Sequence, residues 1–132
     1  MSVVLDTDVA SLLLKQRLPA QLASRLNGQP IIITFVTLAE LTQWAELRRW
    51  GTARRASLQS WVDDVPVLPG AEAVASRWGI ISANARRRGR PRPQNDTWVA
   101  ACCLEYELLL ATRNTKDFDD FVEHEGLVLI SG

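Results

Sequence analysis

Several residues that often carry enzyme chemistry are scarce in this chain of 132 residues. The only histidine is His124, and the only cysteines, Cys102 and Cys103, are adjacent. A single histidine excludes zinc sites built from several histidines and argues against serine–histidine catalysis. Neighbouring cysteines rarely form an unstrained disulfide. We therefore expect two free thiols and a reducing compartment, the cytoplasm.

Long apolar runs, glycine-rich phosphate loops and an excess of charge are also absent. No apolar run approaches the roughly 18 residues of a membrane span, and no basic segment precedes an apolar stretch at the N-terminus. We therefore expect neither a membrane span nor a signal peptide. Neither GxGxxG nor GxxxxGK[ST] occurs. The formal net charge is zero, so the overall field gives no indication of nucleic acid.

What is present has the composition of one folded domain. Apolar residues make up 47% of the chain and charged residues 23%, which is ordinary for a globular protein. A chain of this length buries roughly two-thirds of its unfolded surface, enough for a core of its own. We therefore expect one domain over residues 1–132.

Short apolar runs alternate with helical patterns along the whole chain. Strands are predicted at 2–5, 31–35, 65–68, 108–112 and 127–130, and helices at 9–15, 19–26, 37–50, 52–62, 71–87 and 96–107, with one more helix before the last strand. Strands separated by helices indicate a parallel sheet, and continuous apolar strands indicate that both faces are covered. We predict an α/β fold with a small parallel sheet of four to five strands, flanked by helices on both faces, and Pro66 favours an edge position for the third strand.

Four acidic residues stand where a predicted strand ends or a predicted helix begins: Asp6, Glu40, Asp96 and Asp117. The carboxyl ends of parallel strands meet at one edge of the sheet, so these side chains can converge. Two charges about 4 Å apart at an effective dielectric of about 20 repel by roughly 4 kcal/mol. Oxygen ligands favour Mg²⁺ or Mn²⁺. The pattern predicts a divalent-cation site and phosphodiester chemistry.

Ordinary structural roles could also explain these acids. Asp6 or Asp8 could cap a helix, and the segment Thr37–Glu40 fits a capping box. One of Asn95 and Asp96 could cap the next helix.

The acidic group near the C-terminus is open to two interpretations as well. Asp117, Asp119 and Asp120 could form a solvated loop. Asn114 lies nearer the strand end than Asp117 and could bind a cation through its side-chain carbonyl or through water.

Basic and aromatic residues offer candidate contacts for RNA. The densest basic segment precedes Asp96 and contains Arg86, Arg87, Arg88, Arg90 and Arg92. Such arginines could hold phosphates in bidentate fashion, or could form a solvated helix end. A second basic group flanks the turn at Gly51 and is explained equally well as surface. Trp50 beside that turn could be exposed, and Trp98 could form a wall of the site.

Four segments together carry a resemblance: VVLDTDVAS, TFVTLAEL, GRPRPQNDTWVAA and LATRNTKDF. In this order and spacing they resemble the PIN-domain family, and within it the VapC-type toxins of toxin–antitoxin pairs. The resemblance covers nearly the whole chain. It implies a Mg²⁺- or Mn²⁺-dependent ribonuclease with a small parallel α/β sheet. It also implies a homodimer and a cognate antitoxin that inserts a segment into the active-site groove.

The resemblance also implies site residues. Asp6, Glu40 and Asp96 fall on the family's three main acidic positions, and Asp117 falls on the usual fourth. Many relatives have an acid where this chain has Asn114, so the choice between Asn114 and Asp117 stays open.

Three further residues flank these acidic positions. Asp8 departs from the more usual Asn or Ser and could bind metal or serve the turn. Thr7 and Thr112 could hydrogen-bond the metal ligands.

The resulting hypothesis is metal-assisted, in-line hydrolysis of an RNA phosphodiester, leaving 5′-phosphate and 3′-hydroxyl ends by resemblance. One alternative is a non-catalytic PIN-like module that binds RNA or protein. Another is a haloacid-dehalogenase-like phosphatase with Asp6 as its nucleophile, although the chain is short for that fold and Glu40 would have no role. The RNA target is not predicted.

Overall fold

In the computed structural model, which describes residues 2–131, five parallel strands form one sheet in the order β3-β2-β1-β4-β5. The strands are β1 (Val3–Leu5), β2 (Ile31–Thr34), β3 (Val67–Leu68), β4 (Leu109–Ala111) and β5 (Leu129–Ile130). The expected order of strands and helices is confirmed. The edge position expected for the third strand is confirmed too, because β3 pairs only with β2 among the described residues.

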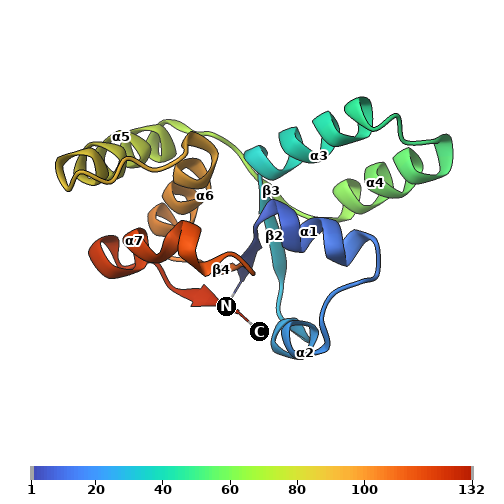
Figure 1. Cartoon of the computed structure of the whole chain (residues 1–132). Coiled ribbons are helices and arrows are strands. Elements are labelled where there is room, and N and C mark those ends of the chain that lie inside the picture. Colours follow the sequence, from blue (N-terminus) through green and yellow to red (C-terminus); the bar gives the residue numbers. More distant parts are fainter. Residues whose placement is uncertain (1, 132) are drawn as a thin grey trace.

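Seven helices within the described residues cover both faces of the sheet. They are α1 (Thr7–Leu14), α2 (Ala20–Leu26), α3 (Phe35–Leu47), α4 (Thr52–Asp64), α5 (Glu72–Arg87), α6 (Gln94–Glu105) and α7 (Thr115–Glu125). Figure 1 shows α1 to α4 on one side of the sheet and α5 to α7 on the other. None of the helices in residues 2–131 is long and apolar enough to cross a membrane.

The continuous apolar character of the strands follows from this two-sided cover. In β1, Val3 and Leu5 belong to the core beneath α1 to α4, whereas Val4 belongs to the core beneath α5 to α7. Successive residues of a strand point to opposite faces, so both sets must be apolar here. All three side chains are fully buried.

The two cysteines lie on α6 and are free and buried, as expected. Burial raises the pKa of the Cys102 thiol to about 11 and raises the pKa of the Cys103 thiol as well. Thiols that stay protonated are poor nucleophiles, so both act as small apolar residues of the core.

Two local expectations are wrong. Trp50 is not exposed beside the Gly51 turn but is 5% exposed and part of the core. The acidic group that includes Asp119 and Asp120 is not a loop but lies on α7, and Asp120 is buried.

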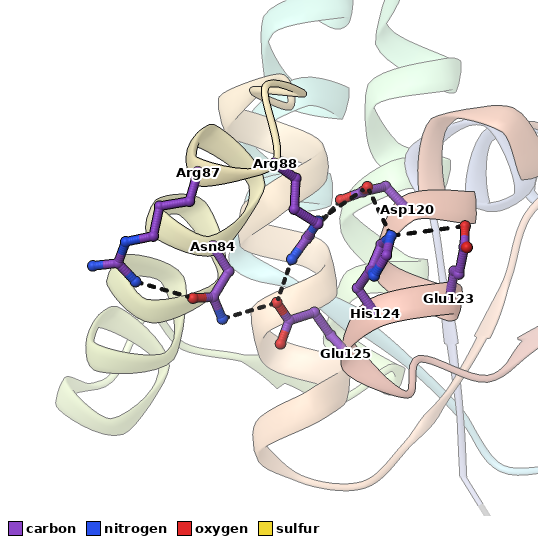
Figure 2. A network of polar contacts seen from close by, with 7 residues as sticks. All are labelled: Asn84, Arg87, Arg88, Asp120, Glu123, His124 and Glu125. Carbon is purple, nitrogen blue, oxygen red and sulfur yellow. Dashed lines mark hydrogen bonds and ion pairs between the residues drawn. The ribbon is translucent and has the colours of Figure 1, made fainter.

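Asp120 belongs to a network that joins the end of α5 to α7 (Figure 2). The Arg88 guanidinium donates two hydrogen bonds to the Asp120 carboxylate, through Nε at 3.3 Å and through Nη2 at 2.5 Å. Its Nη1 lies 3.5 Å from Glu125, which also accepts a hydrogen bond from Asn84. A bidentate pair of this kind fixes orientation as well as distance. It therefore ties α5 to the helix that carries Asp117.

Candidate active site

The four predicted acids line one pocket of about 180 Å³ at the carboxyl edge of the sheet. They come from separate parts of the chain: Asp6 follows β1, Glu40 lies on α3, Asp96 on α6 and Asp117 on α7. Asp8, Thr7 and Asn114 line the same pocket. The fold thus brings together residues that are up to 111 positions apart.

Asp6 both caps α1 and faces the pocket. Its Oδ1 accepts a hydrogen bond from the backbone N–H of Val9 at 2.9 Å. Burial raises the pKa of the Asp6 carboxyl; hydrogen bonds from the Thr112 side chain and Val9 oppose the rise, and the charges of Asp8 and Glu40 add to it. Thr112 is fully buried and lies beside the site.

Glu40 does not take part in a capping box, so that structural explanation is wrong. Helix α3 begins at Phe35, earlier than expected, because the hydroxyl of Thr34 accepts a hydrogen bond from the Thr37 N–H at 3.3 Å. Glu40 is therefore beyond the first turn of the helix. Its Oε1 instead accepts a hydrogen bond from the Thr7 hydroxyl at 2.6 Å.

Thr7 holds Glu40 in place through a short chain of hydroxyl groups. The Thr7 and Thr37 hydroxyl oxygens are 3.0 Å apart. A threonine hydroxyl has one proton, and the proton of Thr7 goes to Glu40, so Thr37 must be the donor to Thr7. This arrangement leaves Oε2 of Glu40 without a hydrogen-bond partner among the described residues.

Asp96 is also free of a capping role. Pro93 precedes α6 as its N-cap, no side chain caps the helix, and Asp96 lies in the first turn. The expectation that Asn95 or Asp96 caps this helix is wrong. Burial raises the pKa of Asp96 to about 6, the negative charges of Asp117, Glu40 and Asp6 contribute to the rise, and Arg92 opposes it. The surroundings of Asp96 therefore disfavour the ionised form of its carboxyl group.

Asn114 and Asp117 both line the pocket, so the choice between them stays open. Asn114 is the N-cap residue of α7 but makes no side-chain capping bond, and Asp117 lies in the first turn. Asp8 stands at the rim, where its carboxylate lies 3.7 Å from the Arg113 guanidinium.

The pocket offers the type of ligand that a hard divalent cation prefers. Its charged groups are carboxylates, and Asn114 adds an amide oxygen. As the side chains stand, no three His, Cys, Asp or Glu groups in residues 2–131 are placed to hold one ion together. The residues fit the chemistry of Mg²⁺ or Mn²⁺, and a cation would offset the repulsion that adds to burial in raising the pKa of Asp96.

The five arginines near Asp96 have different surroundings. Arg86, Arg87 and Arg90 are exposed. Arg92 is half-buried, its charge lowers the pKa of Asp96, and its Nε has no hydrogen-bond partner within the described part of the chain. Arg88 is held by Asp120 and Glu125, so it is not free to hold RNA.

A second, larger hollow of about 350 Å³ adjoins the acid pocket and shares Glu40 with it. Trp98 lines this hollow rather than the acid pocket. Its ring stacks on Trp78 with a centroid separation of 5.2 Å and meets Phe35 edge-on at 5.6 Å. An aromatic wall therefore stands next to the acids.

Three apolar residues that line the acid pocket were missed from the sequence: Trp44, Val99 and Phe118. Helical spacing could have found two of them, because Trp44 is four residues after Glu40 and Val99 is three after Asp96, so each shares a helix face with an acid. Phe118 is adjacent to Asp117, and helical spacing does not signal it.

The comparisons with known proteins agree with this architecture. The family model of the PIN domain matches residues 3–123. The chain belongs to the PIN-domain family. Over 118 residues it is 31% identical to the "tRNA(fMet)-specific endonuclease VapC" of Shigella flexneri, covering 88% of this chain and 89% of that protein.

Solved structures show the same fold. This PIN domain superposes on a chain of VapBC-5 from Mycobacterium tuberculosis with a TM-score of 0.75 and 30% identity, covering 99% of this chain and 98% of that one. A chain of VapBC2 from Rickettsia felis, solved with a promoter DNA fragment, gives a TM-score of 0.83 at 17% identity, covering 100% and 99%. The second likeness concerns the fold alone. The predicted α/β class and the PIN-like architecture are confirmed.

Proposed function

We propose that this PIN domain is an endoribonuclease toxin that hydrolyses RNA phosphodiester bonds with Mg²⁺ or Mn²⁺. The observation that carries the proposal is the single pocket lined by Asp6, Glu40, Asp96 and Asp117. The pKa of Asp96, raised by burial and then by the charges of Asp117, Glu40 and Asp6, supports it, because a bound cation would stabilise the ionised carboxylates. The ribonuclease names of the VapC relatives support the substrate class.

The roles of the side chains follow from their contacts. Asp6 and Asp96 would hold the cation, with Asp117 or Asn114 beside them. When bound, the cation would lower the pKa of a water and offset charge on the phosphate. Thr7 holds Oε1 of Glu40, so Oε2 can accept a hydrogen bond from the attacking water and orient it in line with the leaving oxygen. The hydrogen bond from Thr112 favours the ionised form of Asp6 and so opposes the effect of burial on its pKa.

We further propose a cognate antitoxin as the partner, a homodimer as the assembly and the cytoplasm as the compartment. The antitoxin is supported by the VapBC complexes in which similar chains were solved. The compartment is supported by the two free, buried thiols.

The test is cleavage of an RNA panel by the antitoxin-free protein with Mg²⁺, with Mn²⁺ and with a chelator. The initiator tRNA belongs in the panel because the Shigella relative is named for it. We expect cleavage with either ion and none with the chelator, and products that a 5′-phosphate-dependent exonuclease degrades. Asp6→Asn should abolish cleavage.

Asp119→Asn is the matched control, because Asp119 is an exposed carboxylate on the same helix as Asp117 but outside the pocket. The non-catalytic module would be favoured if no RNA were cut with either ion and pocket variants bound RNA as well as the natural protein. A phospho-aspartate trapped at Asp6 would favour the phosphatase.

A further inference from the structure

A basic pocket of about 530 Å³ lies at the far end of α1 from the acid pocket. Leu14, Lys15 and Arg17 line it from the end of α1, and Trp50, Arg54 and Ser57 line it from the α3–α4 hairpin. Figure 1 shows α1 running beside this hairpin. Resting on the proposed function, we infer that this pocket binds a backbone phosphate of the RNA strand, away from the bond that is cut.

The charge of the basic pocket is unbalanced. Three cationic side chains line it, and no carboxylate does. Within residues 2–131, neither Lys15, Arg17 nor Arg54 forms an ion pair. Grouped cations without partners repel one another, and an anion would relieve that repulsion. Guanidinium groups match a phosphate because they donate two parallel hydrogen bonds to it.

Arg54 is not needed to hold the α3–α4 hairpin together, because the neighbouring Arg55 makes the contacts that join the two helices. Arg55 donates hydrogen bonds to the backbone oxygens of Trp50 at 2.8 Å and Ala45 at 3.0 Å, and it pairs with Glu46 at 3.1 Å. Arg55 thereby joins the two helices of the hairpin. Arg54 only stacks on the Trp50 ring, 4.5 Å from its centroid. The stack leaves the N–H groups of Arg54 available to a ligand.

Trp50 adds an independent sign of a missing acceptor. Its side chain is 5% exposed, and its Nε1–H has no hydrogen-bond partner in the described chain. Buried donors without acceptors are rare in folded proteins because each is destabilising. Trp50 lines the basic pocket, so an oxyanion bound there would lie close to the residue that carries this unpaired donor.

The position of the pocket favours an RNA strand over a free anion. Asp8 in the first turn of α1 lines the acid pocket, and Lys15 after its last turn lines the basic pocket. Seven residues of helix span about 10 Å, which a short stretch of single-stranded RNA can bridge. A second arginine–tryptophan stack lies at the end of α3: the Arg48 guanidinium is 4.8 Å from the centroid of the Trp44 ring, and Trp44 lines the acid pocket.

The test compares two double variants in an Asp6→Asn background, where RNA is bound but not cut. Arg17→Gln with Arg54→Gln removes two charges from the basic pocket. Arg25→Gln with Arg49→Gln removes two charges from exposed positions outside it. Binding of a single-stranded RNA is measured by fluorescence anisotropy at several salt concentrations.

We expect the pocket variant to bind about tenfold more weakly and its salt slope to fall by about 0.7 for the lost phosphate contact, whereas the control keeps its slope. Inorganic phosphate should shift the indole N–H signal of Trp50 in the natural protein and not in the pocket variant. Shortening the RNA to a single dinucleotide should remove the difference between the two variants.

Equal losses of affinity and of slope in the two variants would overturn the inference. The inference would also be overturned if the pocket variant bound RNA normally but no longer bound an acidic antitoxin segment, because the pocket would then be a protein-docking site. In either case the proposed function stands if the natural protein cuts RNA. A natural protein that neither binds nor cuts any RNA would overturn both proposals together.

Discussion

Two carboxylates of this PIN domain are buried to a similar extent, but their pKa values are shifted in opposite directions. Asp6 is 7% exposed and its pKa is raised, whereas Asp120 is 3% exposed and its pKa is lowered. Burial raises the pKa of both carboxyls, and of the two only Asp120 has a cationic partner that outweighs it. Asp6 faces other acids in the pocket, and Asp120 accepts two hydrogen bonds from Arg88 (Figure 2). Burial alone therefore does not decide whether a carboxylate stabilises the fold.

The contrast even runs along one helix. Asp117 and Asp120 are three residues apart on α7, yet Asp117 lines the acid pocket and has no ion pair among the described residues, whereas Asp120 is paired with Arg88. We interpret the Arg88 network as the part of the molecule that holds α7 in place. The acid pocket is the part that keeps negative charge available for a ligand. Changes at the two places should therefore have opposite effects on stability.

The largest expected effect is on catalysis. Asp96→Asn should lower the rate of RNA cleavage by about a thousandfold, because a bound cation supplies several kcal/mol of transition-state stabilisation and this ligand would be lost. Single-turnover cleavage at saturating Mg²⁺ measures it. Asp120→Asn should keep most of the activity at a temperature where it is folded. An Asp96→Asn protein with normal activity would remove Asp96 from the site.

The second effect is on stability at the paired carboxylate. Asp120→Ala should lower the free energy of unfolding by about 3 kcal/mol, because it removes the bidentate partner of the partly buried Arg88 guanidinium and leaves only the longer contact with Glu125. Urea denaturation at pH 7 measures it. Asp119→Ala, an exposed neighbour on the same helix, should change the value by less than about 0.5 kcal/mol. Equal effects of the two substitutions would show that the network adds nothing.

The same pair predicts a pH dependence. The pKa of Asp120 is lowered in the folded state from an ordinary value of 3.8, so its stabilising contribution is complete above that value and is lost as the pH falls through the folded pKa. The gap in unfolding free energy between the natural protein and Asp120→Ala should therefore shrink below about pH 4. A gap that stays constant down to pH 2 would contradict the assignment.

The third effect has the opposite sign and concerns the unpaired carboxylate. The folded pKa of Asp96 is raised from 3.8 to about 6, so stability falls as the pH rises between these values. At pH 7 and without divalent ions, Asp96→Asn should be more stable than the natural protein by about 1 kcal/mol, after allowing for partial exposure. The gain should disappear below pH 4. Thermal melts with a chelator measure it.

Divalent ions sharpen this third test. Mg²⁺ or Mn²⁺ should raise the melting temperature of the natural protein, because a ligand that binds only the folded state stabilises it. The same ions should raise the melting temperature of the Asp96→Asn protein much less. Equal shifts would place the cation elsewhere.

The smallest effect is expected at the edge of the Arg88 network. The His124 imidazole lies 3.9 Å from Asp120 and its side chain is 39% exposed. Solvent screens such a contact, so His124→Gln should change the free energy of unfolding by less than about 0.5 kcal/mol. A loss comparable to that of Asp120→Ala would mean that the imidazole, and not Arg88, holds the carboxylate.

Local patterns were sufficient for the order of the elements and for the positions of the four acids. Short continuous apolar runs and apolar residues at helical spacing depend on neighbouring residues only, so they could be recognised directly. The start of α3 was misplaced because Thr34 and Thr37 are both good capping residues. Which of them caps depends on where β2 ends, and β2 ends where its pairing with β3 ends.

The amino-acid sequence by itself determined the α/β class, the alternation of strands and helices and the placing of acids after strands, because these follow from short-range periodicity. Only the tertiary structure decided which charges meet. Arg88 and Asp120 are 32 residues apart, and Asp6 and Asp117 of the acid pocket are 111 residues apart. Packing alone brings such groups together. Their environment, buried with or without a cationic partner, then sets the pKa of each carboxylate: Asp120 stabilises the fold, and Asp6 and Asp96 of the acid pocket stay without an ion pair among the described residues.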